Sequence, residues 1–190
     1  LNTDHRLVLL GGPGSGKSTF VSIVALCMAG ELLGIPGLGL ATLTAPLPRG
    51  EDADEALQPQ RWDHEPLLPV LVVLRDLASQ LPPPGTPVTA ETLWAFIRGR
   101  LKQAALSDFA PHLKQHLLQK GGLVLLDGLD EVPDASERRV QIKQAVQDFA
   151  TTFSKCRFLV TSRTYAYQRQ DWKLDGFSEA AHAREADGVV

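Results

Sequence analysis

Residues 6–29 read RLVLLGGPGSGKSTFVSIVALCMA, and this stretch decides the fold. Its middle, residues 11–19, fits the pattern of glycine, four free positions and then Gly-Lys-Ser that is typical of phosphate-binding P-loops. The apolar run before the loop predicts a buried strand. The apolar segment after it, at 20–29, predicts a helix against a sheet. Strand, glycine loop and helix is the setting that the motif requires. A dinucleotide fold is disfavoured, because the third position of Gly-x-Gly-x-x-Gly falls on Lys17.

The loop itself predicts a nucleotide-phosphate site. Glycines let the backbone turn tightly, so that its N–H groups converge on an anion at the start of the helix. Lys17 is predicted to reach the β- and γ-phosphates, and the Ser18 hydroxyl to ligate Mg²⁺. The alternative is a chance glycine-rich turn. The predicted cofactor-binding residues are Gly11, Gly12, Pro13, Gly14, Ser15, Gly16, Lys17, Ser18 and Thr19.

Composition sets the limits of the interpretation. A chain of 190 residues, 44% of them hydrophobic, is enough for one domain with a real core. A net charge of -3 gives no general attraction to nucleic acid or to a membrane surface. Cys27 and Cys156 cannot make a disulfide framework, so we expect buried thiols in a reducing, cytoplasmic compartment. No apolar run has the length of a membrane span, and no signal peptide is evident. Because the chain begins at Leu1, just before the loop, we expect a piece of a longer protein.

Four apolar runs, at 7–10, 70–74, 123–126 and 158–160, predict strands. None alternates with polar residues, which indicates a sheet covered on both faces, as parallel sheets are. Helices are predicted at 92–106 and at 134–153, the second starting with a capping-box-like pair, Asp134 and Glu137. The fold class predicted is therefore α/β, a P-loop NTPase three-layer α/β/α sandwich with a mainly parallel sheet. The apolar helix faces are predicted to comprise Leu93, Phe96, Ile97, Leu101 and Ala105, and Val140, Ala145, Phe149 and Phe153.

One domain is expected over residues 1–178. Within it, residues 34–66 are rich in glycine, proline and leucine and predict a mobile surface insertion. Residues 179–190 are interpreted as an atypical or truncated tail. A basic stretch around Arg98, Arg100 and Lys102 is read as a solvated helix face rather than a nucleic-acid contact.

The second chemical element is LVLLDGLDE, residues 123–131. Its apolar run places Asp127 at the carboxyl edge of a buried strand, where open α/β sheets bind ligands. There Asp127 can hold Mg²⁺ through its water shell, opposite Ser18, and Gly128 leaves room beside it. Asp130 and Glu131 follow within one turn, so that one of them can orient or deprotonate an attacking water. The alternative is an ordinary acidic loop after a strand.

These motifs together resemble the NACHT family of signal-transduction NTPases, which are related to AAA-type ATPases and belong to the STAND group. The most specific part is the strand ending in Asp127, Gly128, Asp130 and Glu131. PVLVVLRDL at 69–77 is similar to the family's second strand, and RFLVTSR at 157–163 to its sensor strand. WKLDGF at 172–177 resembles the segment that closes the core. The likeness runs from about residue 6 to residue 177.

The resemblance implies a nucleotide switch that binds ATP, or GTP, with Mg²⁺ and hydrolyses it slowly. It makes Arg163 the sensor that faces the γ-phosphate, a role that a fixed guanidinium at the sheet edge can perform. The alternative for Arg163 is an ion pair with Asp130 or Glu131. For Arg75 we expect a structural ion pair with an acid such as Asp76, or another on the sheet edge, rather than a phosphate contact. The hydroxyls of Thr161 and Ser162 could bond near the γ-phosphate but are more often local caps.

The family's partners are helical, winged-helix and repeat domains further along the chain, which close over the nucleotide and couple its state to self-assembly. Without them, weak binding and no switching are expected. Two other readings stay open: a metabolic P-loop enzyme such as a small-molecule kinase, and a binding-only fragment. The kinase needs an acceptor pocket and lid arginines, for which 34–66 offers only Arg49 and Arg61. The histidines have no metal-ligand spacing, so zinc has no support.

Overall fold

The computed structural model describes residues 2–46, 59–132, 136–168 and 172–181. The strands are β1 Arg6–Leu10, β2 Pro69–Val73, β3 Leu123–Asp127, β4 Arg157–Ser162 and β5 Ser178–Ala181. The helices are α1 Lys17–Leu33, α2 Leu40–Leu43, α3 Leu74–Ser79, α4 Ala90–Gln103, α5 Ala110–Gln119, α6 Ser136–Thr152 and α7 Thr164–Tyr167. Two 3₁₀ turns, Ser107–Phe109 and Leu129–Glu131, complete the described elements.

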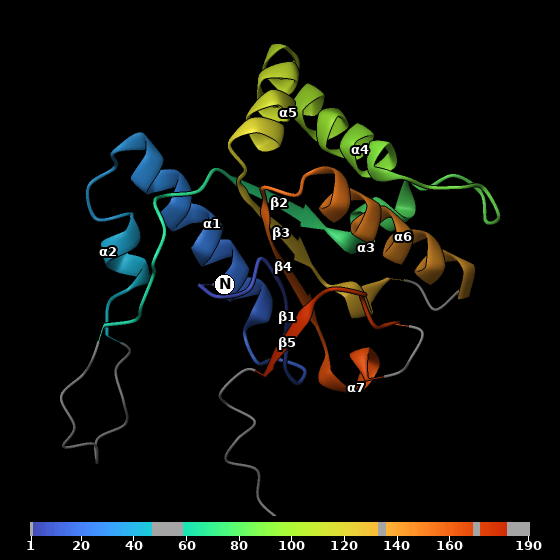
Figure 1. Cartoon of the computed structure of the whole chain (residues 1–190), viewed down its shortest axis with the longest axis horizontal. Helices are drawn as coiled ribbons and strands as arrows, with labels where there is room; N and C mark the ends of the chain where they lie inside the picture. Colours follow the sequence, from blue (N-terminus) through green and yellow to red (C-terminus); the bar gives the residue numbers. More distant parts are fainter. Residues whose placement is uncertain (1, 47–58, 133–135, 169–171, 182–190) are drawn as a thin grey trace, which may run out of the picture.

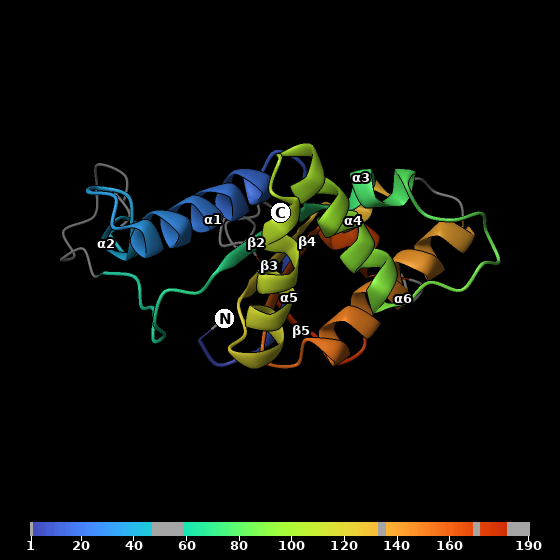
Figure 2. The same cartoon turned by 90° about the horizontal axis from the view of Figure 1, so that it is seen from above.

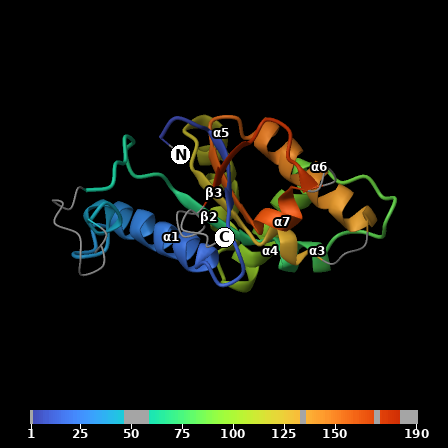
Figure 3. The ribbon, with the colours of Figure 1, turned by 90° about the horizontal axis from the view of Figure 1, so that it is seen from below.

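The strands form one parallel sheet in the order β2-β3-β4-β1-β5 (Figure 1). All four predicted runs lie in strands, except that Leu74 already belongs to α3. Viewed from above and below, α1 lies on one side of the sheet and α6 on the other (Figures 2 and 3). The predicted class, an α/β/α sandwich built on a parallel sheet, is therefore confirmed.

Alternate strand residues bury two separate cores, one on each face of the sheet. Val124 and Leu126 of β3 join the larger core, which α3, α4, α5 and α6 cover. Leu123 and Leu125 of the same strand join a smaller core under α1. Because both faces of β3 are buried, its sequence is a continuous apolar run without polar alternation.

The path of the chain opens a crevice at the carboxyl edge of the sheet. From β1 the chain passes through α1, which packs on β2 and β3, to the far edge of the sheet. From β3 it returns through α6 on the opposite face to β4, which pairs with β1. The segments after β1 and β3 thus leave the sheet toward opposite faces, and open α/β sheets bind ligands at such a point.

The helix predicted at 92–106 is α4, which starts two residues earlier and ends three residues earlier. Thr89 caps its start, because its hydroxyl accepts from the N–H of Glu91. Leu93, Phe96 and Ile97 are buried as predicted. The placement of Ala105 on the apolar face is wrong. This residue lies beyond the helix in the left-handed region, at φ 59°, and is exposed.

The helix predicted at 134–153 is α6, and Ala145, Phe149 and Phe153 are buried as expected. Val140 was predicted on the same face, and this is wrong, because its side chain is 61% exposed. The first buried side chains described in α6 are those of Gln141 and Ile142, and residues one or two apart on a helix point in different directions. The predicted start at Asp134 lies outside the described residues.

The segment at 34–66, interpreted from the sequence as a mobile surface insertion, makes contacts with the rest of the domain at its two described ends. Its first part turns back as α2, whose first N–H, that of Leu40, donates to Glu31 Oε2 at 2.7 Å. Trp62, near its other end, packs against the smaller core. The middle, 47–58, lies outside the described residues. These contacts could not be predicted from the sequence, because the segment has no helical or strand periodicity.

The interpretation of 179–190 as a tail is wrong at its beginning. Residues 178–181 form β5, which extends the sheet beside β1 with Leu7 opposite Ser178. The segment Ser-Glu-Ala-Ala has little apolar character, and an edge strand of this kind is held mainly by main-chain hydrogen bonds. Trp172 and Leu174, just before it, are buried in the larger core.

Cys27 and Cys156 are free and buried, as expected. Burial raises the pKa of the Cys156 thiol to about 12, although a backbone hydrogen bond with Gly122 acts in the other direction. Among the described helices, none has the length and apolar character needed to cross a lipid bilayer.

Candidate functional site

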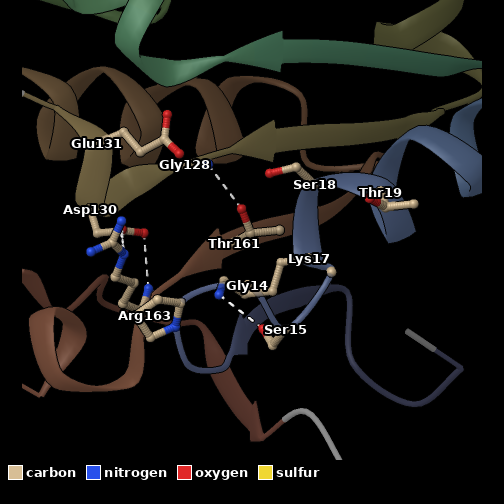
Figure 4. Close-up of a pocket in the computed structure, with 12 residues that line it drawn as sticks. Gly14, Ser15, Lys17, Ser18, Thr19, Gly128, Asp130, Glu131, Thr161 and Arg163 are labelled. Atoms are coloured by element: carbon tan, nitrogen blue, oxygen red, sulfur yellow. Dashed lines mark hydrogen bonds and ion pairs between the residues drawn. The ribbon is translucent and has the colours of Figure 1, made fainter.

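Three segments that are far apart in the sequence line one pocket at the carboxyl edge of the sheet (Figure 4). Its volume is about 300 Å³, within the size range of small-molecule sites. The loop after β1 contributes Pro13, Gly14, Ser15, Gly16, Lys17, Ser18 and Thr19; the turn after β3 contributes Gly128, Asp130 and Glu131; and the end of β4 contributes Thr161 and Arg163.

The loop after β1 leads into a start of α1 that no side chain caps. Gly14 and Gly16 have φ of 72° and 86°, in the left-handed region that a side chain disfavours. Residue 16 is the N-cap of α1 and offers no side chain to the first turn, so the N–H groups of that turn are left for a ligand. Uncapped N–H groups and the helix dipole together favour a phosphate at this position.

Lys17 folds back onto its own loop. Its ammonium donates to the carbonyl oxygens of Gly11 and Gly12, each at 2.8 Å, and to Ser15 Oγ at 3.2 Å. These bonds use all three of the donors that an ammonium has. A phosphate in the pocket would have to take over at least one of them. Gly11 and Gly12, which the sequence predicted as ligands, do not line the pocket and instead supply these carbonyls.

The metal ligand predicted on β3, Asp127, is the last residue of the strand and is half-buried. Its Oδ1 accepts the Thr161 hydroxyl at 2.5 Å, and Thr161 Oγ1 in turn accepts the N–H of Gly128 at 2.8 Å. Asp127 is not among the pocket-lining residues; its neighbour Gly128 is. The carboxylate therefore lies just behind the wall of the pocket.

The two residues predicted to hold magnesium, Ser18 and Asp127, offer oxygen atoms as ligands. The described residues contain no group of three or more His, Cys, Asp or Glu that could hold a metal ion. Magnesium keeps several waters and takes few protein ligands, the rest coming from phosphate oxygens. The hydroxyl of Ser18 and the carboxylate of Asp127 are hard oxygen ligands of the type that such a site uses.

Asp130 is committed to Arg163. Its Oδ1 accepts the main-chain N–H of Arg163 at 2.9 Å, and its Oδ2 lies 2.9 Å from Nε of the same arginine. The Asp130 side chain is only 7% exposed, whereas that of Arg163 is 54% exposed. The sequence left open whether Arg163 pairs with an acid or is free to face a phosphate. In the structure Arg163 forms the ion pair with Asp130, and Arg163 also lines the pocket.

Glu131 is held much more loosely. Arg75 Nη1 lies 3.7 Å from its Oε2, and both side chains are largely in solvent, at 64% and 42% exposure. This is the structural ion pair on the sheet edge that the sequence predicted for Arg75. An exposed pair at this distance contributes little, about 0–1 kcal/mol. Of the two acids Asp130 and Glu131, Glu131 is therefore the one whose carboxylate stays accessible to water in the pocket.

Sequence reasoning missed the role of Thr161, which it treated as a local cap or a phosphate contact. A hydroxyl residue opposite the strand-ending aspartate was visible in the sequence. Recognising the contact, however, required the pairing of β3 with β4. The P-loop is tied to the same strand, since the N–H of Gly11 donates to the carbonyl of Ser162 at 3.3 Å.

No protein-family model matches the chain, and neither the curated proteins nor the solved structures include a match.

Proposed function

We propose that the chain is the nucleotide-binding core of a regulatory NTPase, which binds ATP, or GTP, with Mg²⁺ and hydrolyses it slowly. One observation carries the proposal: the glycine loop, the acidic turn and the end of β4 line a single pocket at the carboxyl edge of a parallel sheet. Each of the three supplies a different part of phosphoryl-transfer chemistry.

The phosphates would bind at the start of α1. The N–H groups of the loop and the first turn are donors directed at an anion, and the ammonium of Lys17 adds a positive charge. In the structure the Lys17 ammonium donates its hydrogen bonds to loop carbonyl oxygens. A neutral carbonyl is a weaker acceptor for a charged donor than a phosphate oxygen. If Lys17 exchanged these carbonyl oxygens for phosphate oxygens, binding of the anion would change the conformation of the loop.

Ser18 and Asp127 would hold magnesium between them, together with phosphate oxygens and water. When bound, the ion neutralises charge that develops on the transferred phosphoryl group. For the attacking water we assign Glu131, because Asp130 is engaged in two bonds with Arg163. A carboxylate within reach of a water can orient it and accept its proton, which typically accelerates a reaction about 10²–10⁴-fold.

Arg163 would act as the sensor of the γ-phosphate by exchanging Asp130 for the phosphate. An arginine whose partner depends on the nucleotide gives the site two states, as a switch requires. Slow hydrolysis suits such a role, because P-loop switches without an activating partner turn over slowly. The assignment to a NACHT-type switch, with its helical, winged-helix and repeat partners and its self-assembly, rests on the sequence motifs alone.

Release of inorganic phosphate from ATP and from GTP, measured with and without Mg²⁺, tests the proposal. We expect slow, Mg²⁺-dependent release by the wild-type chain, a rate at least about tenfold lower for Glu131→Gln, and unchanged nucleotide affinity. Glu65→Gln is the matched control, because this glutamate is exposed and outside the pocket. Equal rates for Glu131→Gln and wild type would refute the assignment of Glu131. Absence of any Mg²⁺-dependent release would refute the hydrolytic part of the proposal.

A further inference from the structure

We propose that Thr161 is a positioning residue for the metal ligand: its hydroxyl fixes the Asp127 carboxylate and the turn that follows, and thereby sets the affinity for Mg²⁺. The inference rests on the proposed function, because it concerns the same site. In this role Thr161 acts through its bonds to Asp127 and Gly128 rather than as a ligand of the metal.

The strand register brings Asp127 and Thr161 together. β3 and β4 are parallel neighbours with Leu126 opposite Val160, so the next step along both strands sets Asp127 beside Thr161. Both residues continue the alternation of Leu125 and Leu159, which face the smaller core under α1. They therefore lie on the face of the sheet that the P-loop helix covers.

The direction of each hydrogen bond follows from the chemistry of the groups. The main-chain N–H of Gly128 can only donate, so Thr161 Oγ1 is the acceptor at 2.8 Å. The single hydroxyl proton is then left for Asp127 Oδ1, at 2.5 Å. Because Thr161 is only 1% exposed, water cannot readily take the place of either bond. The two bonds therefore hold Oδ1 of Asp127 in a fixed position as a hydrogen-bond acceptor.

One hydroxyl thus aligns two parts of the site. It occupies Oδ1 of Asp127, while Oδ2 has no hydrogen-bond partner within the part of the chain that is described. It also anchors the N–H of Gly128, which turns the chain at φ 80° into the segment with Asp130 and Glu131. Partners that orient a metal ligand in this way typically change metal affinity about 10–100-fold when removed.

The test compares Thr161→Val, which keeps the shape but lacks the hydroxyl, with Thr161→Ser, which keeps the hydroxyl. The probe is a fluorescent ATP analogue, whose affinity is measured over a range of Mg²⁺ concentrations and in EDTA. For Thr161→Val we expect the Mg²⁺ concentration at half-maximal enhancement of binding to rise about 10–100-fold, with affinity in EDTA unchanged. Thr161→Ser should stay close to wild type.

Thr151→Val is the matched control, since this threonine is exposed on α6 and its hydroxyl bonds the carbonyl of Gln147. In an Asp127→Asn background, Thr161→Val should add no further change. If Thr161→Val does not fold, the comparison of a variant without the hydroxyl and one with it is made between Thr161→Ala and Thr161→Ser. An Mg²⁺ dependence equal to that of wild type, or an equal loss of affinity in EDTA, would overturn the role of Thr161. Failure of the wild-type chain to bind the analogue at all would instead overturn the proposed function, and this inference with it.

Discussion

The pair between Asp130 and Arg163 gives a prediction that separates a sensing arginine from a structural one. If Arg163 must leave Asp130 to reach a γ-phosphate, the free energy of that pair opposes binding of a triphosphate. Replacing Asp130 with Asn removes the charge that holds the guanidinium and keeps an oxygen for the main-chain N–H. The substitution should therefore favour the triphosphate-bound state over the empty one.

The size of the effect can be estimated from the contacts. Hydrogen bonds to charged groups contribute about 1.5–3 kcal/mol, whereas exposed ion pairs contribute about 0–1 kcal/mol. The carboxylate is 7% exposed and the guanidinium 54% exposed, so solvent screens one side of the pair. We place the pair between these limits, at ~1–2 kcal/mol. Its loss would raise the affinity for a triphosphate about 5–30-fold.

The assay is calorimetric titration of wild type and Asp130→Asn with a non-hydrolysable ATP analogue and with ADP. ADP lacks the γ-phosphate, so its affinity should not change. Asp108→Asn, an exposed aspartate outside the pocket, is the control. An equal gain for both nucleotides, or no gain for the triphosphate, would refute the idea that Arg163 exchanges Asp130 for the γ-phosphate.

Four further predictions concern the glycine loop, the contact of α1 with Leu38, helix α4 and a buried thiol. Gly16→Ala puts a side chain at φ 86°, which costs about 1–2 kcal/mol, and should weaken phosphate binding about tenfold in an equilibrium titration. Gly30→Ala would overlap the main chain of Leu38 and should lower the free energy of unfolding in urea by about 1–3 kcal/mol. Gly99→Ala in α4, with no atom near the added carbon, should raise it by about 0.5–1 kcal/mol. Because the folded-state pKa of Cys156 is raised from 9.0 to about 12, its contribution to stability is present below pH 9 and lost as pH rises toward 12. Urea unfolding of Cys156→Ala should lack that part of the pH dependence.

The buried strands of the sheet could be predicted from the sequence, whereas the edge strand β5 could not. β3 is buried on both faces, so it appears in the sequence as a short continuous apolar run. β5 is an edge strand of small and polar residues, held by pairing with β1, and no local pattern marks it. Val140 shows the same limit in a helix, because an apolar residue does not by itself reveal which stripe meets the core.

In the candidate site, Lys17, Glu131 and Arg163 converge on one pocket, which the predicted residues Asp127, Gly11 and Gly12 do not line. The convergence concerns the edge of the sheet. It was predictable because parallel strands end at one edge of the sheet. The partners of each side chain were not predictable. That Asp130 rather than Glu131 holds Arg163, and that Thr161 holds Asp127, depends on strand register and on the geometry of the turn after β3.

The most direct test of the central claim is equilibrium binding of a fluorescent ATP or GTP analogue to the wild-type chain and to Lys17→Ala. Lys102→Ala, a change of an exposed lysine on α4, serves as the control, and circular dichroism checks that each variant folds. We predict saturable, Mg²⁺-enhanced binding by wild type and by Lys102→Ala, and a loss of at least about tenfold in affinity for Lys17→Ala. Equal binding by wild type and Lys17→Ala would contradict the account, because the glycine loop would then not be where the phosphates are held.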